Sequence, residues 1–282
     1  MLFINTTKQL EDLADILSSE KLIGIDTEFV RKNTYFAKLA LVQISTHAEI
    51  YLIDPLSLDL AAIKGVLIDK DIVKIFHACS QDVRIFHDVL GIETQNIFDT
   101  QEAIKFLGIR DQISYQDACL KILNIAIEKE QQFREWDIRP IPHDMELYAA
   151  QDVEHLIDLY NSLKKMMEEK KIYNNFCRFM ESFSAKEFYQ VKFDEMWKKV
   201  RTKETNKRFL YNLQLLASFR ESCAIELNIP RMHAISDNDL LKITEYLPQS
   251  VSHLAKLNIR LSKLNKSLVD KLFDLCAGLK EK

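Results

Sequence analysis

The sequence predicts an α/β domain built on a mixed β-sheet, followed by a small all-α domain. Three strand-like segments near the N-terminus have short connections, which favours antiparallel pairing; they are Leu22–Phe29, Leu39–Ile44 and Ile50–Ile53. Strands then alternate with helices, which predicts a mixed sheet flanked by helices. No convincing strand pattern follows residue 170. We therefore expect a first domain over residues 1–170, a helical linker over 171–207 and a helical domain over 208–282.

The elements of the first domain follow from apolar spacing and from residues that begin or end helices. Residues 8–18 place leucines and isoleucines at helical spacing. Capping and breaking residues then mark the later elements. These are a helix over 59–68, a strand Val73–Phe76, a helix Ser80–Val89 capped by Ser80, a strand Asn96–Asp99, a helix Thr100–Leu107 closed by Gly108, a helix over 114–123, a polar loop over 124–143 and a long helix from about Asp144.

The helical domain is expected to follow a charged junction at residues 198–208. Leu210–Leu227 has a helical pattern that ends near Pro230. Ser236, with Asp239 three residues later, resembles a capping box. Leu247 precedes a proline and ends that helix. Two further helical patterns fill residues 250–280, so we predict a small all-α module.

Composition excludes several classes of protein. No apolar run reaches the roughly 18 residues of a membrane span, and the first eight residues lack the features of a signal peptide. The five cysteines are scattered without Cys-x-x-Cys spacing, which indicates reduced thiols and a cytoplasmic protein. The five glycines form no cluster, so a phosphate-binding loop is not expected.

Charge is distributed unevenly along the chain. Residues 1–200 hold 24 basic and 33 acidic residues, whereas residues 201–282 hold 14 and 9. An acidic part joined to a basic part suits a metal-dependent catalytic domain with an accessory domain that binds a polyanion. Ordinary variation of surface charge is the alternative.

Four acidic residues and one tyrosine predict a metal site. Asp26 and Glu28 are two apart in a strand and project from the same face. Tyr148 and Asp152 are four apart in a helix and share one side, and Asp82 lies in the first turns of another helix. Each group alone has an ordinary structural explanation: a solvated strand end for Asp26 and Glu28, a surface aspartate with a half-buried core tyrosine for Asp152 and Tyr148, and stabilisation of a helix N-terminus for Asp82. Together they indicate a cage of oxygen ligands for two divalent ions, Mg²⁺ or Mn²⁺, which is a centre for phosphodiester hydrolysis.

These residues resemble the motifs of the DEDD superfamily of 3′→5′ exonucleases, and specifically ribonuclease D. The first motif is similar to Asp26-Thr-Glu-Phe-Val-Arg-Lys-Asn-Thr-Tyr35, continued by Leu39-Ala-Leu-Val-Gln43. The second is similar to His77-Ala-Cys-Ser-Gln-Asp82, and the third to Trp136-Asp-Ile-Arg-Pro140 with Leu147-Tyr-Ala-Ala-Gln-Asp-Val153. A tyrosine four residues before the last aspartate marks the tyrosine subtype. The chain departs from the family at Arg134-Glu135, where Ser-Asp is usual.

The resemblance implies a ribonuclease H-like fold and a role for each acid. Asp26 would contact both metals, Glu28 and Asp152 would hold the metal that carries the attacking water, and Asp82 would serve the other metal. Tyr148 would position the water. Residues Leu213–Cys276 resemble the HRDC helical module, which implies an accessory domain that binds nucleic acid.

RNA contacts are expected from cations and rings near the site. The candidates are Phe29, Arg31, Tyr35, Lys129, Trp136 and Arg139. A solvated charge or a core aromatic is the alternative for each. Gln43 is expected to be a hydrogen-bonding residue at a strand end, and His77 a structural histidine.

We therefore predict a metal-dependent 3′→5′ exoribonuclease that releases 5′-mononucleotides. RNA is its expected partner, in particular tRNA precursors, and tRNA 3′ maturation its expected role. A monomer is expected. The two alternatives are a DNA 3′→5′ exonuclease and a non-catalytic RNA-binding protein.

Overall fold

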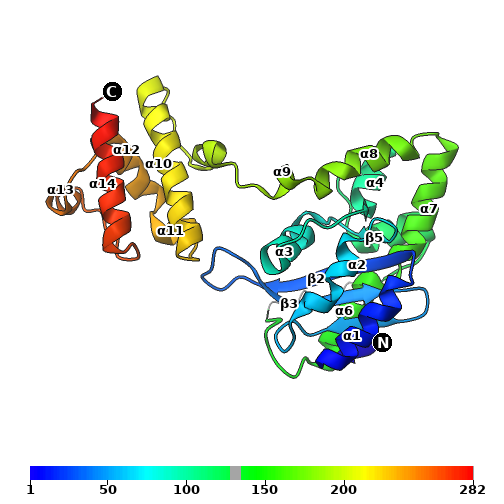
Figure 1. Ribbon diagram of the computed structural model, residues 1–282. Coiled ribbons are helices and arrows are strands. Elements are labelled where there is room, and N and C mark those ends of the chain that lie inside the picture. The colour runs from blue at the N-terminus through cyan, green and yellow to red at the C-terminus, as the bar shows by residue number, and fades with distance from the viewer. Residues whose placement is uncertain (128–134, 282) are drawn as a thin grey trace. The chain divides into compact units, whose positions relative to one another are not determined.

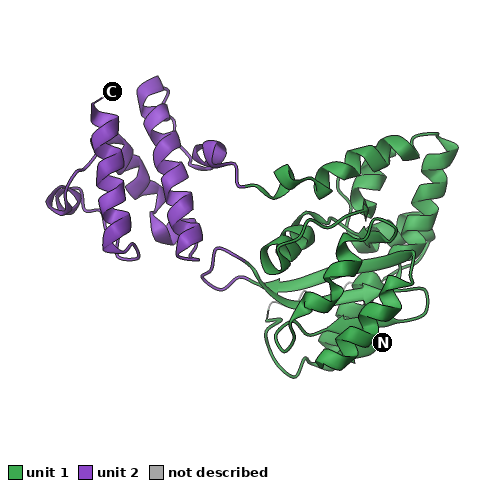
Figure 2. Ribbon diagram, in the orientation of Figure 1, with its two compact units in different colours: residues 1–30, 37–190 green, residues 31–36, 191–282 purple. Residues whose placement is uncertain are grey.

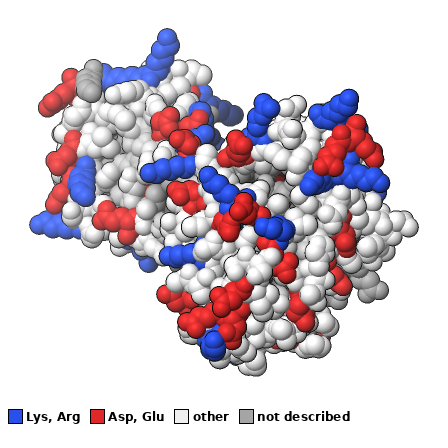
Figure 3. Space-filling model, turned by 45° about the vertical axis from the view of Figure 1, so that its right-hand side comes forward, with Lys and Arg blue, Asp and Glu red and all other residues white. Residues whose placement is uncertain are grey.

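The computed structural model describes residues 1–127 and 135–281. The chain forms two compact units, shown in different colours in Figure 2: Met1–Val30 with Ala37–Gln190, and Arg31–Phe36 with Val191–Lys282. Helices of the predicted linker belong to both units, and the boundaries predicted at residues 170 and 208 stay predictions. Basic and acidic side chains are intermixed on the face that Figure 3 shows. Across the two described ranges, no helix combines the length and apolarity needed to cross a membrane.

The first unit is built on a six-stranded mixed sheet with the order β1-β4-β3-β2-β5-β6. The antiparallel pairs are β2 with β3 and β3 with β4, as predicted, while β1 pairs with β4, β5 with β2 and β6 with β5 in parallel. The strands are β1 Leu2–Ile4, β2 Leu22–Val30, β3 Lys38–Ser45, β4 Ile50–Ile53, β5 Val73–Phe76 and β6 Ile97–Asp99. Strand β1 was not predicted, because three residues are too short to show a period.

Helices cover this sheet and carry most of the core (Figure 1). Helix α6 contacts β2, β3 and β4, and α7 contacts β2 and β5. The helical elements are α1 Thr7–Ser18, η1 Leu60–Ile63, α2 Lys64–Ile68, α3 Ser80–Leu90, α4 Thr100–Phe106, α5 Tyr115–Ala118, the π-helical η2 Cys119–Leu123, α6 His143–Glu154, α7 Leu156–Glu169, α8 Tyr173–Ser184 and α9 Lys186–Tyr189. The helix predicted from Asp144 is thus two helices that meet at His155.

The predicted cap at Ser80 is wrong. Cys79 is the N-cap of α3, and it makes no side-chain capping hydrogen bond. The buried Asp99 carboxylate holds this turn instead, because it accepts hydrogen bonds from the N–H groups of Ala78 (3.1 Å) and Cys79 (2.7 Å). Ala78 has a left-handed φ of 65°, which is costly for a residue with a Cβ. Asp99 also caps α4, so one carboxylate fixes the starts of two helices.

Gly24 allows β2 to pass closely beneath α7. A Cβ at Gly24 would clash with Ser45 Oγ and would lie 2.9 Å from Leu156 Cβ. Ser45 cannot easily move aside, since its Oγ donates a 2.8 Å hydrogen bond to the carbonyl of Val153. The strand that carries Asp26 and Glu28 is therefore held against the end of α6 and the start of α7.

Gly24→Ala should lower the free energy of unfolding by about 1–3 kcal/mol, since overpacking forces neighbouring atoms to shift. Urea unfolding measures this change. Gly65→Ala in α2 is the control, because a Cβ there would meet nothing within 4 Å. Equal stabilities for the two variants would contradict this account of Gly24.

The second unit is helical and has its own core. Its elements are η3 Phe193–Lys199, α10 Lys207–Glu226, α11 Arg231–Ala234, α12 Asp237–Tyr246, α13 Val251–Lys256 and α14 Lys266–Lys280. Ser236 caps α12 as predicted, with its Oγ accepting from Asp239 N–H at 3.1 Å. The assignment of this unit as an HRDC module stays a prediction.

Residues Arg31–Phe36, which follow β2 directly, belong to this helical unit. The Tyr35 hydroxyl donates to Glu221 Oε1 at 2.7 Å. Asn228 Oδ1 accepts from the backbone N–H groups of Tyr35 and Phe36, both at 3.1 Å. Both the backbone of this segment and the Tyr35 hydroxyl therefore hold it to the helical unit.

Candidate active site

Asp26 and Glu28 lie on β2 where this strand extends past its parallel neighbour. Strand β5 pairs with Leu22–Gly24 only, and beyond Gly24 the same strand contacts α3 through the hydrogen bond between Thr27 and Asp82. The alternation of a strand places both carboxylates on the face that α6 covers. Both side chains are partly exposed, which leaves them accessible to an ion or a substrate.

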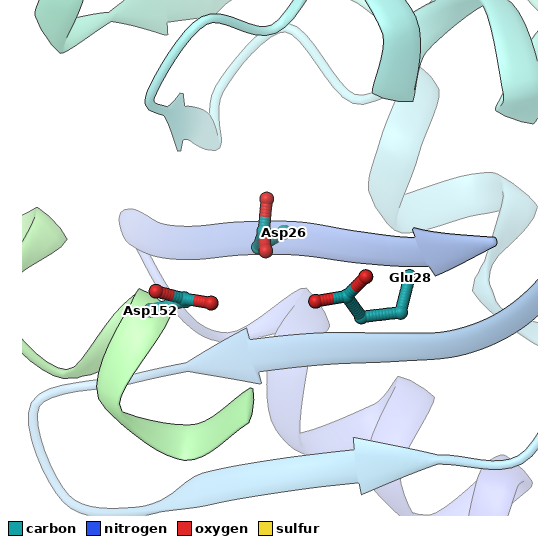
Figure 4. A group of neighbouring side chains, drawn as sticks. All are labelled: Asp26, Glu28 and Asp152. Carbon is teal, nitrogen blue, oxygen red and sulfur yellow. The ribbon is translucent and has the colours of Figure 1, made fainter. Parts of the chain in front are cut away.

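Asp152 approaches this pair from α6. One carboxylate oxygen from each of Asp26, Glu28 and Asp152 lies within 4.8 Å of the others. Figure 4 shows the carboxyl groups of Glu28 and Asp152 pointing toward one another, with Asp26 on the strand beside them. Strand β2 and helix α6, which are distant in the chain, therefore bring these three predicted acids together.

Asp82 lies beside this group, on α3, and is buried. Its Oδ1 accepts a 2.5 Å hydrogen bond from Thr27 Oγ1. Its charge still contributes to raising the pKa of Asp26 and of Glu28. The structure thus brings three of the four predicted acids into one cluster and places Asp82 as a neighbour held by the same strand.

The electrostatics of the cluster favour bound cations. Burial, followed by the charges of Asp82, Asp152 and Glu28, raises the pKa of Asp26 well above its usual value. Burial and the charges of Asp152 and Asp82 raise the pKa of Glu28 to about 8. Burial raises the pKa of Asp82 and of Asp152 to about 7. Carboxylates this close resist joint ionisation unless a positive charge compensates them.

Tyr148 is one helical turn before Asp152 and is half-buried. Burial and the charges of Asp152, Glu28 and Asp26 raise its pKa, so the phenol keeps its proton at neutral pH. A hydrogen bond from Tyr148 lowers the pKa of Asp152, although burial outweighs it. Tyr148 is therefore suited to donate a hydrogen bond and not to accept a proton.

The cluster opens into a pocket of about 580 Å³. Its lining is Asp26, Glu28, Phe29, His77, Gln81, Ser114, Tyr115, Gln116, Tyr148 and Asp152. Sequence reasoning missed Gln81 and Ser114–Gln116 as lining residues; Ser114 is a helix cap, a signal that locates a turn but no pocket. His77 hydrogen-bonds Thr100 Oγ1 (2.8 Å) and the Ile113 carbonyl (2.9 Å), which agrees with the structural role expected for it.

Two of the predicted RNA contacts lie within the fold. Trp136 is only 2% exposed and packs in the core beneath α6. Arg139 forms two hydrogen bonds with the buried Asp54, Nε to Oδ2 at 2.9 Å and Nη2 to Oδ1 at 2.6 Å. It also donates to the carbonyls of Ala40, Trp136 and Ile138. These contacts give Arg139 a structural function.

The other predicted contacts are dispersed. Phe29 lines the pocket. Arg31 is exposed, and Tyr35 is partly buried with its hydroxyl bonded to Glu221; both belong to the helical unit. Lys129 lies outside the described residues. Phe29 is thus the one member of the predicted set among the described residues that lines the pocket beside the carboxylates.

The donor set of the cluster fits a hard divalent cation. All its ligand atoms are carboxylate oxygens, which Mg²⁺, Mn²⁺ and Ca²⁺ prefer over the nitrogen and sulfur ligands of zinc. Oxygens that surround one such ion at about 2.0–2.6 Å lie within about 5 Å of one another, and one oxygen of each of the three carboxylates meets this condition. Asp26, Glu28 and Asp152 would hold the ion, with Asp82 beside them.

Comparison with known proteins assigns the class. A family model described as 3′-5′ exonuclease matches residues 1–168, which is more than half of the chain. The ribonuclease D of Bartonella henselae is 34% identical over 269 residues, and that of Jannaschia sp. is 30% identical over 272 residues. These alignments cover 95% and 94% of this chain. The chain belongs to the ribonuclease D family of 3′-5′ exonucleases.

The match in structure extends over both units. The crystal structure of Escherichia coli RNase D, an exoribonuclease involved in structured RNA processing, has a TM-score of 0.86 and 26% identity, and the match covers 99% of this chain and 75% of that one. This confirms the predicted ribonuclease H-like α/β fold. The chain spans 65% of the length of the Bartonella relative and 70% of the Jannaschia relative.

Proposed function

We propose that the protein is a metal-dependent exoribonuclease that removes nucleotides from RNA 3′ ends as 5′-monophosphates. The convergence of Asp26, Glu28 and Asp152 in the lining of a pocket carries this proposal. Family membership supports the direction of attack, and the relatives named ribonuclease D support RNA as the substrate. The pocket volume is within the range of about 300–1,000 Å³ of small-ligand sites, which suits a terminal nucleotide.

Each side chain of the site has a distinct part in this proposal. Divalent cations, when bound, would stabilise the charge that develops at the phosphate and lower the pKa of a water molecule. The carboxylates hold them, and Asp82 adds negative charge from the α3 side. Tyr148 keeps its proton and orients the attacking water by hydrogen bonding. Phe29 presents an aromatic ring to the pocket, where it can stack on the terminal base.

The finer parts of the proposal concern ions, substrate and setting. Two ions, Mg²⁺ or Mn²⁺, suit the oxygen ligands and phosphoryl chemistry. Precursors of tRNA are the RNA we propose, with the protein acting as a monomer. Arg31 and Tyr35 are proposed to contact RNA outside the pocket, and Lys129 remains a candidate. We propose a cytoplasmic location, for which the scattered cysteines without Cys-x-x-Cys spacing are the support.

A cleavage assay tests the function with two RNA substrates, one labelled at the 5′ end and one labelled uniformly. A 5′-labelled RNA with a single-stranded 3′ tail should shorten in single-nucleotide steps with Mg²⁺ or Mn²⁺, and uniformly labelled RNA should yield 5′-mononucleotides. Single-stranded DNA of matched sequence is the parallel substrate. A preference for DNA above about tenfold, the discrimination that 1.4 kcal/mol supplies, would favour the DNA exonuclease. Divalent binding without cleavage of either polymer would leave a nucleic-acid-binding protein.

Tyr148→Phe should lower kcat by about 10- to 100-fold, toward the lower end of the roughly 10²–10⁴-fold that a general acid or base contributes, because the hydroxyl orients the water and keeps its own proton. The affinity for Mn²⁺ should fall by less, at most about tenfold, since the hydroxyl holds no ion and acts on it only through its hydrogen bond to Asp152. Single-turnover cleavage and calorimetric titration measure the two quantities. Equal losses in both would show that the tyrosine has been assigned the wrong role.

A further inference from the structure

Gln43 is a polar side chain in the interior of β3, among buried residues. It is completely buried. Neither its Nε2 nor its Oε1 has a hydrogen-bond partner among residues 1–127 and 135–281. A buried amide that lacks partners destabilises a fold, and an apolar side chain of similar size would avoid that cost. The prediction that Gln43 hydrogen-bonds at a strand end therefore finds no partner in the described part of the chain.

The register of the sheet places Gln43 beside the carboxylate cluster. Gln43 is directly opposite Asp26 in the β2–β3 pair. Opposed residues of an antiparallel pair project from the same face, with Cβ atoms about 4.5–5.5 Å apart. On its other side, Gln43 is opposite the apolar Leu52 of β4. Of the two residues opposite Gln43 in the neighbouring strands, Asp26 is the polar one.

We propose that Gln43 is a positioning residue for Asp26: its amide NH₂ donates the hydrogen bond that orients the Asp26 carboxylate when a divalent cation is bound. The inference rests on the proposed function, because it assigns a cation to that carboxylate. Carboxylates that bind metals are themselves hydrogen-bonded, and loss of such a partner typically weakens metal binding about 10- to 100-fold. Gln43 is placed to be this partner, and its amide has a donor to spare for it.

The test is Gln43→Met, which keeps an unbranched side chain of similar volume and removes both polar atoms. Leu41→Met is the matched control, because Leu41 is buried on the same face of β3, opposite Glu28. Calorimetric titration with Mn²⁺ alone, in the full chain without RNA, gives the affinity. The melting temperature after EDTA treatment gives the metal-free stability. Gln43→Leu repeats the test if the Met variant folds poorly.

Gln43→Met should weaken Mn²⁺ binding by about tenfold and leave the metal-free melting temperature unchanged or raised by about 2–4 °C. Leu41→Met should change the affinity by less than about twofold. Unchanged affinity in Gln43→Met, an equal loss in Leu41→Met, or a lower metal-free melting temperature in Gln43→Met would each overturn the proposal. Failure of wild-type protein to cleave RNA while Mn²⁺ binding still depends on Gln43 would instead refute the proposed function alone.

Discussion

Asp26→Asn is expected to lower the rate of RNA 3′-end hydrolysis by at least about 10³-fold, equivalent to about 4 kcal/mol of transition-state stabilisation. Asp26 is the acid whose pKa is raised by all three other carboxylates, and its oxygen lies in the cluster with Glu28 and Asp152. An amide keeps the shape of the side chain but removes the negative charge that holds a cation. Single-turnover cleavage of a 5′-labelled RNA measures the effect, with Asp88→Asn on the outer part of α3 as the control. Trimming by Asp26→Asn within about tenfold of wild type would refute the assigned site.

Although Asp26→Asn should lower activity, it should raise the stability of the metal-free protein. The pKa of Asp26 is raised in the folded protein, so its contribution to stability is complete below its unfolded pKa of about 3.9 and is lost as pH rises through the folded value. An asparagine at this position cannot ionise and escapes this loss. EDTA-treated Asp26→Asn should therefore melt above wild type near pH 8, with the difference disappearing near pH 4. A variant that melts lower at pH 8 would contradict the electrostatic account.

Arg139→Met should destabilise the first unit by about 3 kcal/mol, because it leaves Asp54 buried without its charged partner. The Asp54 side chain is 6% exposed and that of Arg139 is 24% exposed, so the pair is largely protected from solvent. Burial alone would raise the pKa of Asp54, but the hydrogen bonds from Arg139 and Leu56 N–H outweigh it and lower the pKa. Loss of the guanidinium also removes the hydrogen bonds that it donates to the carbonyls of Ala40 and Trp136.

Urea unfolding of Arg139→Met, with the exposed Arg110→Met as the control, measures the effect. The double variant Asp54→Leu with Arg139→Met should recover part of the lost stability, because it removes the unpaired charge. A loss below about 1 kcal/mol, the size typical of an exposed ion pair, together with weaker RNA binding by the folded variant, would instead favour the RNA contact that the sequence indicated.

The strands that surround the site were predictable because their periodicity is local. Hydrophobic patterns placed β2 to β5 close to their observed bounds, and the spacings of Asp26 with Glu28 and of Tyr148 with Asp152 placed each pair on one face. Strand β1 is too short for such a pattern. The break at His155 and the turn at Ala78 depend on tertiary contacts, which no window of sequence contains.

The sequence was least informative about what surrounds each polar or aromatic side chain. Arg139 and Trp136 lie in one of the sequence motifs. The motif does not show that the Arg139 guanidinium forms hydrogen bonds with Asp54, 85 residues earlier. Gln43 belongs to a strand whose apolar residues predict burial, yet only the register shows that it is opposite Asp26. Long-range pairing therefore decides between structural and functional roles for the same residue types.

Diffraction from crystals soaked in Mn²⁺, recorded where manganese scatters anomalously, tests the carboxylate cluster most directly. We predict anomalous density among Asp26, Glu28 and Asp152 in wild-type protein, and its loss in Asp26→Asn. Density confined to other parts of the surface, with this cluster empty at saturating Mn²⁺, would contradict the account.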